Sequence, residues 1–128
     1  MNWMLIVSGF LAAFATIGHF VMGSKNFLVP MLGADFPEVP KRVMHSVFHY
    51  ISVNFVLSTL ALLVAGFDLV KTYDLSSLVL FIAVQFALFV LVQLIVIFAT
   101  KVERGLFRMF QWTVFLPIAV FAFLGLFV

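Results

Sequence analysis

The sequence lacks cysteine and has very few charged residues. No cysteine occurs among its 128 residues, so disulfides, thiolate metal sites, cysteine-type haem attachment and dithiol redox chemistry are excluded. Charged residues make up 9% of the chain, whereas soluble domains carry about 25%. The seven Lys and Arg residues are too few and too scattered for a nucleic-acid-binding face. The composition therefore excludes a soluble domain and predicts no nucleic-acid partner.

A second absence concerns the position of the acidic residues. All five carboxylates lie in or beside the connectors between apolar segments: Asp35, Glu38, Asp68, Asp74 and Glu103. Small exporters that exchange a cation for protons depend on a carboxylate within the membrane. No apolar segment carries a polar stripe along its whole length, as a pore would need. A small oligomeric transporter or pore is therefore the least favoured class.

What the chain does contain is apolar surface, since 66% of its residues are hydrophobic. A spanning helix needs roughly 20 mostly apolar residues. Four segments meet this length, at about 3–22, 43–67, 75–99 and 106–128. The first run continues past a small-residue motif to Val21, so we expect an uncleaved anchor in the lipid bilayer. Short second and third connectors force antiparallel neighbours. We predict one all-α domain over residues 1–128, an integral membrane four-helix bundle with up-down-up-down topology.

Residues that start and stop helices coincide with these boundaries. Gly23 is expected to end the first helix and Gly66 the second. Pro40 suits the first turn of the second helix, where a missing N–H costs nothing. Asp74 is a candidate N-cap for the third helix. Pro117 lies inside the fourth segment and is expected to kink it.

The basic residues are distributed unequally between the two sides of the predicted bundle. Six of the seven flank the first and third connectors: Lys25, Lys41, Arg42, Lys101, Arg104 and Arg108. Only Lys71 belongs to the opposite side. Connectors rich in Lys and Arg stay in the cytoplasm. We therefore expect a multi-pass protein of a bacterial inner membrane, with both termini outside the cytoplasm.

Polar side chains gather in the predicted cytoplasmic half. His19 lies about one turn from the end of the first segment, and His45 and His49 occupy the first two turns of the second. Gln93 lies roughly 10 Å from the cytoplasmic end of the third segment, at a rise of ~1.5 Å per residue. Gln111 lies near the start of the fourth. All four segments thus contribute polar groups at a similar depth.

One face of the first segment carries a stripe of small residues: Ser8, Ala12, Ala15, Thr16, His19 and Gly23. Such a stripe lets a second helix approach closely, so His19 is expected to point towards a neighbouring helix. Asn54 points away from the face of His45, and Gln85 near mid-membrane has no evident partner in the sequence. The stripe supports an alternative function, a purely structural accessory or assembly subunit that packs against other membrane subunits, and a homo-oligomer is a further possible assembly.

The histidines allow three interpretations. In the first they hydrogen-bond between helices or sit at the headgroup boundary. In the second they ligate a cofactor or metal, and in the third they form a proton or quinone site, because polar groups inside a membrane are functional by default. The His-x-x-x-His spacing of His45 and His49 is weak evidence by itself. With His19, this pair would give a three-nitrogen site for a transition metal with an open position.

A b-type haem is the other ligation hypothesis. His19 and His49 come from adjacent antiparallel segments at comparable depth, an arrangement that offers one imidazole to each face of the iron. Arginine matches a carboxylate in bidentate fashion, so basic residues at the same end are expected to meet the propionates. The predicted cofactor-binding residues beside the two histidines are Arg42, Arg104, Arg108 and Gln111.

A set of short motifs runs from the first segment into the second: Gly18-His19, Gly23, Pro30-Met31-Leu32, Arg42, Phe48-His49 and Ser52. This set resembles a family of small bacterial four-span inner-membrane proteins. In that family a Gly-His-x-x-x-Gly element and a Pro-Leu-Leu-like element precede an aromatic-His-x-x-Ser element. Here Phe48 stands in place of Trp and Met31 in place of Leu. The resemblance implies that His19 and His49, rather than His45, form the pair to test, and it implies no activity.

These features predict a non-catalytic membrane subunit or carrier. Its polar layer in the cytoplasmic half would bind a cofactor such as b-type haem, a transition metal or a quinone headgroup. The convergence of all three histidines and most basic residues at one depth is the observation behind this hypothesis.

Overall fold

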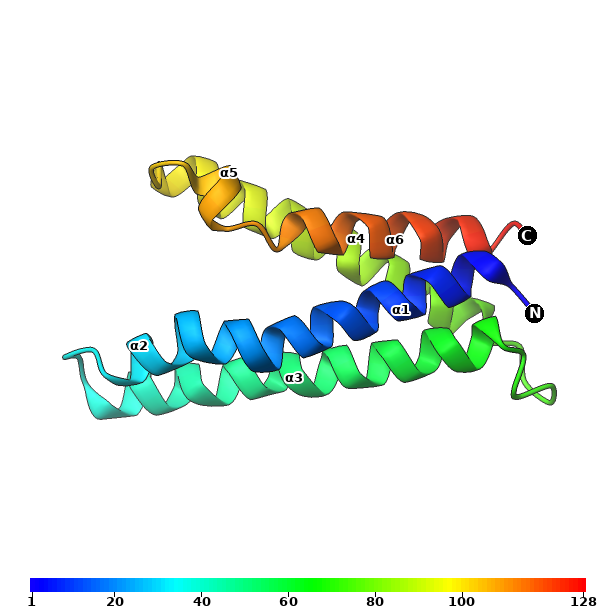
Figure 1. The fold of residues 1–128 in the computed structure, drawn as a ribbon, viewed down its shortest axis with the longest axis horizontal. Helices are drawn as coiled ribbons and strands as arrows, with labels where there is room; N and C mark the ends of the chain where they lie inside the picture. Colours follow the sequence, from blue (N-terminus) through cyan, green and yellow to red (C-terminus); the bar gives the residue numbers. More distant parts are fainter.

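The computed structural model describes residues 1–128 as helices joined by short loops, without strands (Figure 1). The first helix runs without interruption through three parts: α1 (Trp3–Gly18), η1 (His19–Leu28) and α2 (Val29–Leu32). The remaining elements are α3 (Glu38–Gly66), α4 (Ser76–Thr100), the single turn α5 (Gly105–Arg108) and α6 (Trp112–Gly125). The all-helical prediction is confirmed.

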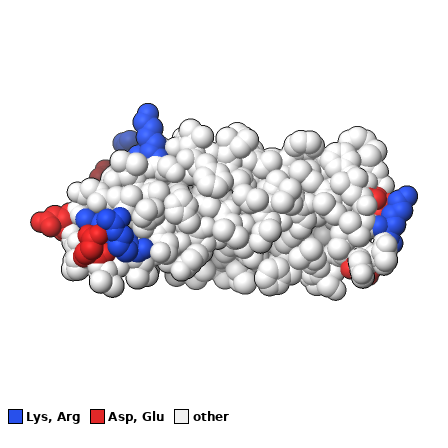
Figure 2. Space-filling view, turned by 90° about the horizontal axis from the view of Figure 1, so that it is seen from below, with Lys and Arg blue, Asp and Glu red and all other residues white.

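Three helices are long and apolar enough to cross a membrane: Trp3–Leu32, Glu38–Gly66 and Ser76–Thr100. The fourth apolar helix, α6, is shorter. Figure 2 shows charged side chains at the two ends of the elongated molecule and an uncharged belt between them. Charges are costly within hydrocarbon, so this distribution is consistent with a membrane protein.

The first helix does not end at Gly23 as the sequence predicted. It continues as η1, a π-helix in which N–H groups bond five residues back, as Val29 does to the Ser24 carbonyl. Gly23 and Leu28 are buried. The glycine lies against the ring of Phe48, 3.5 Å from the position that a Cβ would take. Because this segment packs against α3, it stays helical where local glycine preference alone would end the helix.

The boundaries set by local chemistry agree better with the prediction. Pro40 lies in the first turn of α3, and Gly66 ends that helix. Asp68 follows with a φ of 55°, in the left-handed region that turns the chain away. The N-cap of α4 is Leu75 and not Asp74 as predicted. The carboxylate of Asp74, one residue earlier, still accepts a hydrogen bond of 2.9 Å from the N–H of Ser76, the first residue of α4.

The fourth segment differs from the single span expected over 106–128. The chain leaves helical geometry between α5 and α6, where Met109 has φ −106° and ψ 68°. The indole of Trp112 donates to the Leu106 carbonyl at 3.0 Å and satisfies a backbone group freed by the break. The 14 residues of α6 rise about 21 Å, less than the ~30 Å of a hydrocarbon core. Pro117 lies inside α6, and the kink expected there stays a prediction.

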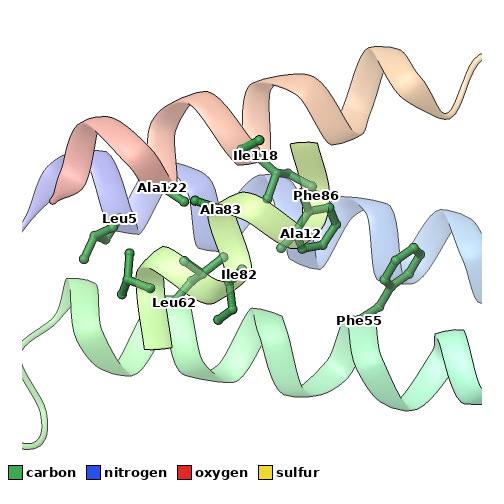
Figure 3. Packing of buried hydrophobic residues seen from close by; sticks show 11 residues of the cluster. Leu5, Ala12, Phe55, Leu62, Ile82, Ala83, Phe86, Ile118 and Ala122 are labelled. Carbon is green, nitrogen blue, oxygen red and sulfur yellow. The ribbon is translucent and has the colours of Figure 1, made fainter. Parts of the chain in front are cut away.

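The helices associate as two pairs, α1 with α3 and α4 with α6, and α1 also packs along α6. The pairs lie close together at the end that carries both termini and diverge towards the opposite end (Figure 1). The core sits where they meet. Leu62, Phe86, Ile118 and Ala12 fill it from α3, α4, α6 and α1, each almost completely buried (Figure 3).

Asn2 closes the end at which the helices converge. Its backbone N–H donates to the Gly66 carbonyl at 2.7 Å, and its side-chain amide donates to the Gly125 carbonyl at 2.7 Å. Its side-chain oxygen accepts from the N–H of Leu5 at 3.2 Å and caps α1. The two glycines permit the close approach, since a Cβ on Gly66 would lie 2.8 Å from the backbone nitrogen of Ile6.

Candidate functional site in a cleft between the diverging helices

A cleft opens where the two helix pairs diverge. It holds about 770 Å³ of empty space, including its open side, and is lined by the end of α1, the start of η1, the middle of α3 and the start of α6. Six of the 14 lining residues are phenylalanines: Phe14, Phe27, Phe48, Phe55, Phe110 and Phe115. Only two lining residues, His19 and Gln111, carry polar side chains. The cleft is therefore an apolar space with two hydrogen-bonding groups in its wall.

His19 lies against α3. Its Nε2 atom is 3.1 Å from the Phe48 carbonyl oxygen and 2.9 Å from the hydroxyl of Ser52. Its ring stacks on that of Phe48, with centroids 4.1 Å apart and planes at 18°. Because a carbonyl oxygen only accepts, we assign the proton to Nε2. The Nδ1 atom then keeps its lone pair and faces Gly23, which lines the cleft.

The structure brings His19 and His49 together through Ser52. The hydroxyl of this buried serine also lies 3.4 Å from Nδ1 of His49 and 3.2 Å from the Phe48 carbonyl. The third histidine, His45, is next in line, with its ring centroid 5.2 Å from that of His49. His45, His49 and Ser52 lie on one face of α3, at spacings of four and three residues. One hydroxyl, that of Ser52, links this face to His19.

Gln111 belongs to an amide pair on the other wall. Its side-chain oxygen accepts from the Gln93 amide nitrogen at 2.6 Å, which joins α6 to α4. The amide nitrogen of Gln111 makes no hydrogen bond within the chain, so its N–H groups remain available. The side-chain oxygen of Gln93 is buried without a partner. Sequence reasoning placed both glutamines at this depth but did not pair them.

The predicted arginines do not line the cleft. Arg42 forms an exposed ion pair with Glu38 one turn earlier, at 2.7 Å. Arg104 belongs to a separate hollow between the end of α4 and α5. Arg108 is exposed at the end of α5. These side chains mark the charged end of the molecule, which leaves His19 and Gln111 as the predicted residues that line the cleft.

The histidines do not form a metal-binding cluster in this arrangement, since no group of three His, Cys, Asp or Glu side chains has suitable proximity. A haem between His19 and His49 would have to displace Ser52, because its hydroxyl is within hydrogen-bond distance of both rings. The two ligation hypotheses remain predictions from the sequence. The geometry instead presents neutral hydrogen-bonding groups to an apolar space.

The aromatic lining is the part of the site that sequence reasoning did not identify. The chain has 18 Phe residues in all four apolar segments, and such side chains in a span usually pack against lipid or one another. The ring of Phe110 reaches the cleft because the helix breaks just before α6. No local signal distinguishes it from the phenylalanines that face outwards. Comparison of the chain with models of known families, with curated proteins and with solved structures gives no match.

Proposed function

We propose that the chain is a small non-catalytic carrier or subunit that binds a quinone-type ligand from the bilayer in this cleft. We further propose that it lies in a bacterial inner membrane as an up-down-up-down four-helix bundle with both termini outside the cytoplasm. The lining of the cleft is the observation that supports the ligand class. Aromatic walls surround only two polar side chains, His19 and Gln111, which come from different helix pairs.

The chemistry of the cleft suits a flat ring with two oxygens. Ligand sites are mostly apolar with a few placed polar groups, and ten of the 14 residues that line this cleft are hydrophobic. Phenylalanine rings stack on a flat conjugated ring. The free amide N–H of Gln111 can donate to one oxygen. The lone pair on Nδ1 of His19 can accept from a hydroxyl at the other, so the reduced, hydroxyl-bearing form is expected to bind more tightly than the oxidised form.

Quenching of Trp112 fluorescence tests this proposal. The chain has two tryptophans, and Trp112 follows Gln111, which lines the cleft. The Trp3→Phe variant therefore leaves a single reporter next to the cleft wall. With this variant in lipid nanodiscs, a decyl-substituted benzoquinone should quench the signal saturably, and the corresponding hydroquinone should compete. Quenching that rises linearly without saturation would show partition into lipid and would overturn the proposal.

Gly18 offers a way to fill the cleft without touching its hydrogen bonds. A Cβ at this position meets no atom within 4 Å, and the residue lines the cleft. Gly18→Leu is expected to weaken binding by about tenfold or more, a loss of ~1.4 kcal/mol. The matched control is Ile17→Leu, on the outer surface with 64% exposure, which should bind as the parent does. Equal affinity of the two variants would place the ligand elsewhere.

The alternative function, an accessory or assembly subunit, was based on the small-residue stripe of the first helix as a surface for another subunit. The small-residue stripe of the first helix packs inside the molecule: Ser8 donates to the Ile118 carbonyl at 2.8 Å, and Thr16 lies 3.2 Å from Thr59. The stripe is thus occupied by α3 and α6. A stable membrane partner recovered with the purified protein, without saturable quinone binding, would favour the accessory-subunit function. A Soret band or stoichiometric metal in the purified protein would favour ligation.

A further inference from the structure

We propose that Ser52, His49 and His45 form a path along which protons pass between His19 in the cleft and water at the charged end of the molecule. The inference rests on the proposed function only for the identity of the group in the cleft. The path itself consists of side chains that can give and take protons; hydrogen-bond distances join His19, Ser52 and His49, and the ring of His45 packs beside that of His49.

The first link crosses from η1 to α3. Nε2 of His19 lies 2.9 Å from the Ser52 hydroxyl, and that hydroxyl lies 3.4 Å from Nδ1 of His49. These contacts form a continuous chain of hydrogen-bond donors when both histidine rings carry their proton on Nε2. The N–H of His19 donates to Ser52. The hydroxyl of Ser52 donates to the Phe48 carbonyl at 3.2 Å, and a rotation about its C–O bond would turn the same proton to the unprotonated Nδ1 of His49. Each of the three groups can both give and take a proton.

The second link follows α3 towards its first turn. His49 is exposed on the helix surface, and the ring of His45 lies one turn nearer the charged end with centroids 5.2 Å apart. At ~1.5 Å per residue, His45 is about 10 Å and His49 about 17 Å from the start of α3. The exposed ion pair of Arg42 with Glu38 lies just beyond His45 and marks the polar end of the path.

The proposed transfer moves protons only, and no group is oxidised or reduced. A proton from a ligand hydroxyl or from water in the cleft binds Nδ1 of His19, while the Nε2 proton passes to the Ser52 oxygen. The hydroxyl proton of Ser52 passes to Nδ1 of His49, and the Nε2 proton of His49 leaves to water or to His45. One proton enters the path and one leaves it. Such an exchange would serve a ligand that gains or loses protons in the cleft.

A different reading of the same contacts is that they only hold the helices together. Both readings predict that loss of Ser52 weakens α1–α3 packing. They differ in the rate at which the His19 ring proton exchanges with solvent, because a structural bond does not carry protons. The exchange rate can be measured in ligand-free protein, so its outcome does not depend on whether a quinone binds.

The experiment is hydrogen–deuterium exchange of histidine ring protons, followed by NMR with ¹⁵N-labelled histidine in nanodiscs. In Ser52→Ala the His19 ring proton is expected to exchange about tenfold more slowly, equivalent to ~1.4 kcal/mol in barrier height. Ser52→Thr keeps a hydroxyl and should restore the rate. His49→Phe should slow exchange as Ser52→Ala does.

Ser58→Ala is the matched control, because Ser58 is also buried on α3, with 4% exposure, and lies away from the histidines. It should leave the exchange rate unchanged. The proposal is overturned if Ser52→Ala exchanges as fast as the wild type, or if Ser58→Ala slows exchange equally. Failure of quinone to quench Trp112, with the Ser52 effect intact, would reject the ligand class and leave the path standing.

Discussion

His19 is the residue on which the site and the packing of the first helix both depend. It lies within hydrogen-bond distance of two α3 groups through one nitrogen and stacks on Phe48, so substitutions should affect stability as well as binding. His19→Phe keeps the stacked ring and removes the polar contacts. We expect a loss of about 1–2 kcal/mol in the free energy of unfolding, measured by denaturant titration in detergent micelles.

The same substitution at His45 provides the comparison. No hydrogen bond involves the His45 side chain, and its ring lies beside that of His49. His45→Phe should change the free energy of unfolding by less than about 0.5 kcal/mol. If the two variants unfold alike, the hydrogen bonds of His19 contribute nothing measurable to the fold.

Asp74, outside the apolar segments, gives a prediction on titration. The pKa of its carboxyl is lowered below 3.8, first by the hydrogen bond from the Ser76 hydroxyl at 2.6 Å and then by that from the Ser76 N–H. A lowered pKa means that the ionised group stabilises the fold above the unfolded pKa, and that this contribution is lost as the pH falls through the folded pKa. Ser76→Ala should therefore raise the pKa of Asp74 towards 3.8.

Carboxyl ¹³C chemical shifts measured against pH would report this change. Ser77→Ala removes a neighbouring hydroxyl that does not reach Asp74, and it should leave the titration of Asp74 where it is. A Ser76→Ala protein with an unaltered Asp74 titration would show that the hydroxyl bond does not persist in solution.

At the scale of helices, two glycines differ in their surroundings: Gly66 is closely packed against α1, whereas Gly18 has open space beside it. A Cβ on Gly66 would lie 2.8 Å from the backbone nitrogen of Ile6, which cannot move without shifting α1. Gly66→Ala is thus expected to destabilise the protein by about 1–3 kcal/mol through overpacking. Gly18→Ala meets open space and should be neutral or stabilising by about 0.5–1 kcal/mol, because alanine favours helix over glycine. Thermal unfolding of both variants in one detergent gives the comparison, and equal losses would contradict it.

Helices α3 and α4 share few contacts, yet a reciprocal amide pair joins them. Asn54 donates to the Gln85 oxygen at 3.1 Å, and Gln85 donates to the Asn54 oxygen at 2.9 Å. Either single change to leucine leaves one amide unpaired in an apolar region, whereas the double change leaves none. A double-mutant cycle is expected to give a coupling of about 0.6–1.7 kcal/mol. Additive losses would show that the two side chains do not interact.

Features set by local chemistry were predictable, and features set by tertiary packing were not. Gly66 ends α3 and Asp74 binds the first turn of α4, since both effects act within a few residues. Gly23 was expected to stop a helix that instead continues against Phe48. The pairing of Asn54 with Gln85 depends on which helices become neighbours, and one sequence does not specify this.

The site was predictable to a similar degree. Depth and periodicity placed His19, His49 and Gln111 in one layer, and the structure finds His19 joined to His49 and places Gln111 in the cleft wall. Hydropathy does not predict the break between α5 and α6, because Met109 and Phe110 are as apolar as the residues of a continuous helix. That break and the aromatic lining are what turn a polar layer into a cleft.

For the whole molecule, asymmetry between the two ends explains where the cleft lies. Asn2, Gly66 and Gly125 hold three helices together at the end with the termini. At the other end the helix pairs diverge (Figure 1), and six phenylalanines line the cleft between them. In a membrane the open side would face lipid, which suits a ligand that arrives from the bilayer.

The distribution of basic residues predicts the orientation of the chain in the membrane. Because the chain has no cysteine, a maleimide will label only a cysteine that is introduced. Six of seven basic residues lie at the end that carries α2 and α5, and such ends remain in the cytoplasm. A single cysteine at Thr72, between α3 and α4, should react with a membrane-impermeant maleimide on intact cells. A single cysteine at Ala34, between α2 and α3, should react only after the membrane is opened. The reverse pattern would contradict the orientation.

The same labelling decides whether the fourth segment crosses. By length α6 alone falls short of the hydrocarbon core, so crossing requires the residues of α5 and the break to extend the path. With Glu103→Cys protected in intact cells, a labelled Phe127→Cys would show that the segment spans and that the carboxyl terminus lies outside. If both cysteines are protected, the segment enters and returns on the cytoplasmic side. That outcome would separate the carboxyl end of α6 from Asn2, to which its Gly125 carbonyl is bonded, so the hydrogen bonds that close the terminal end favour crossing.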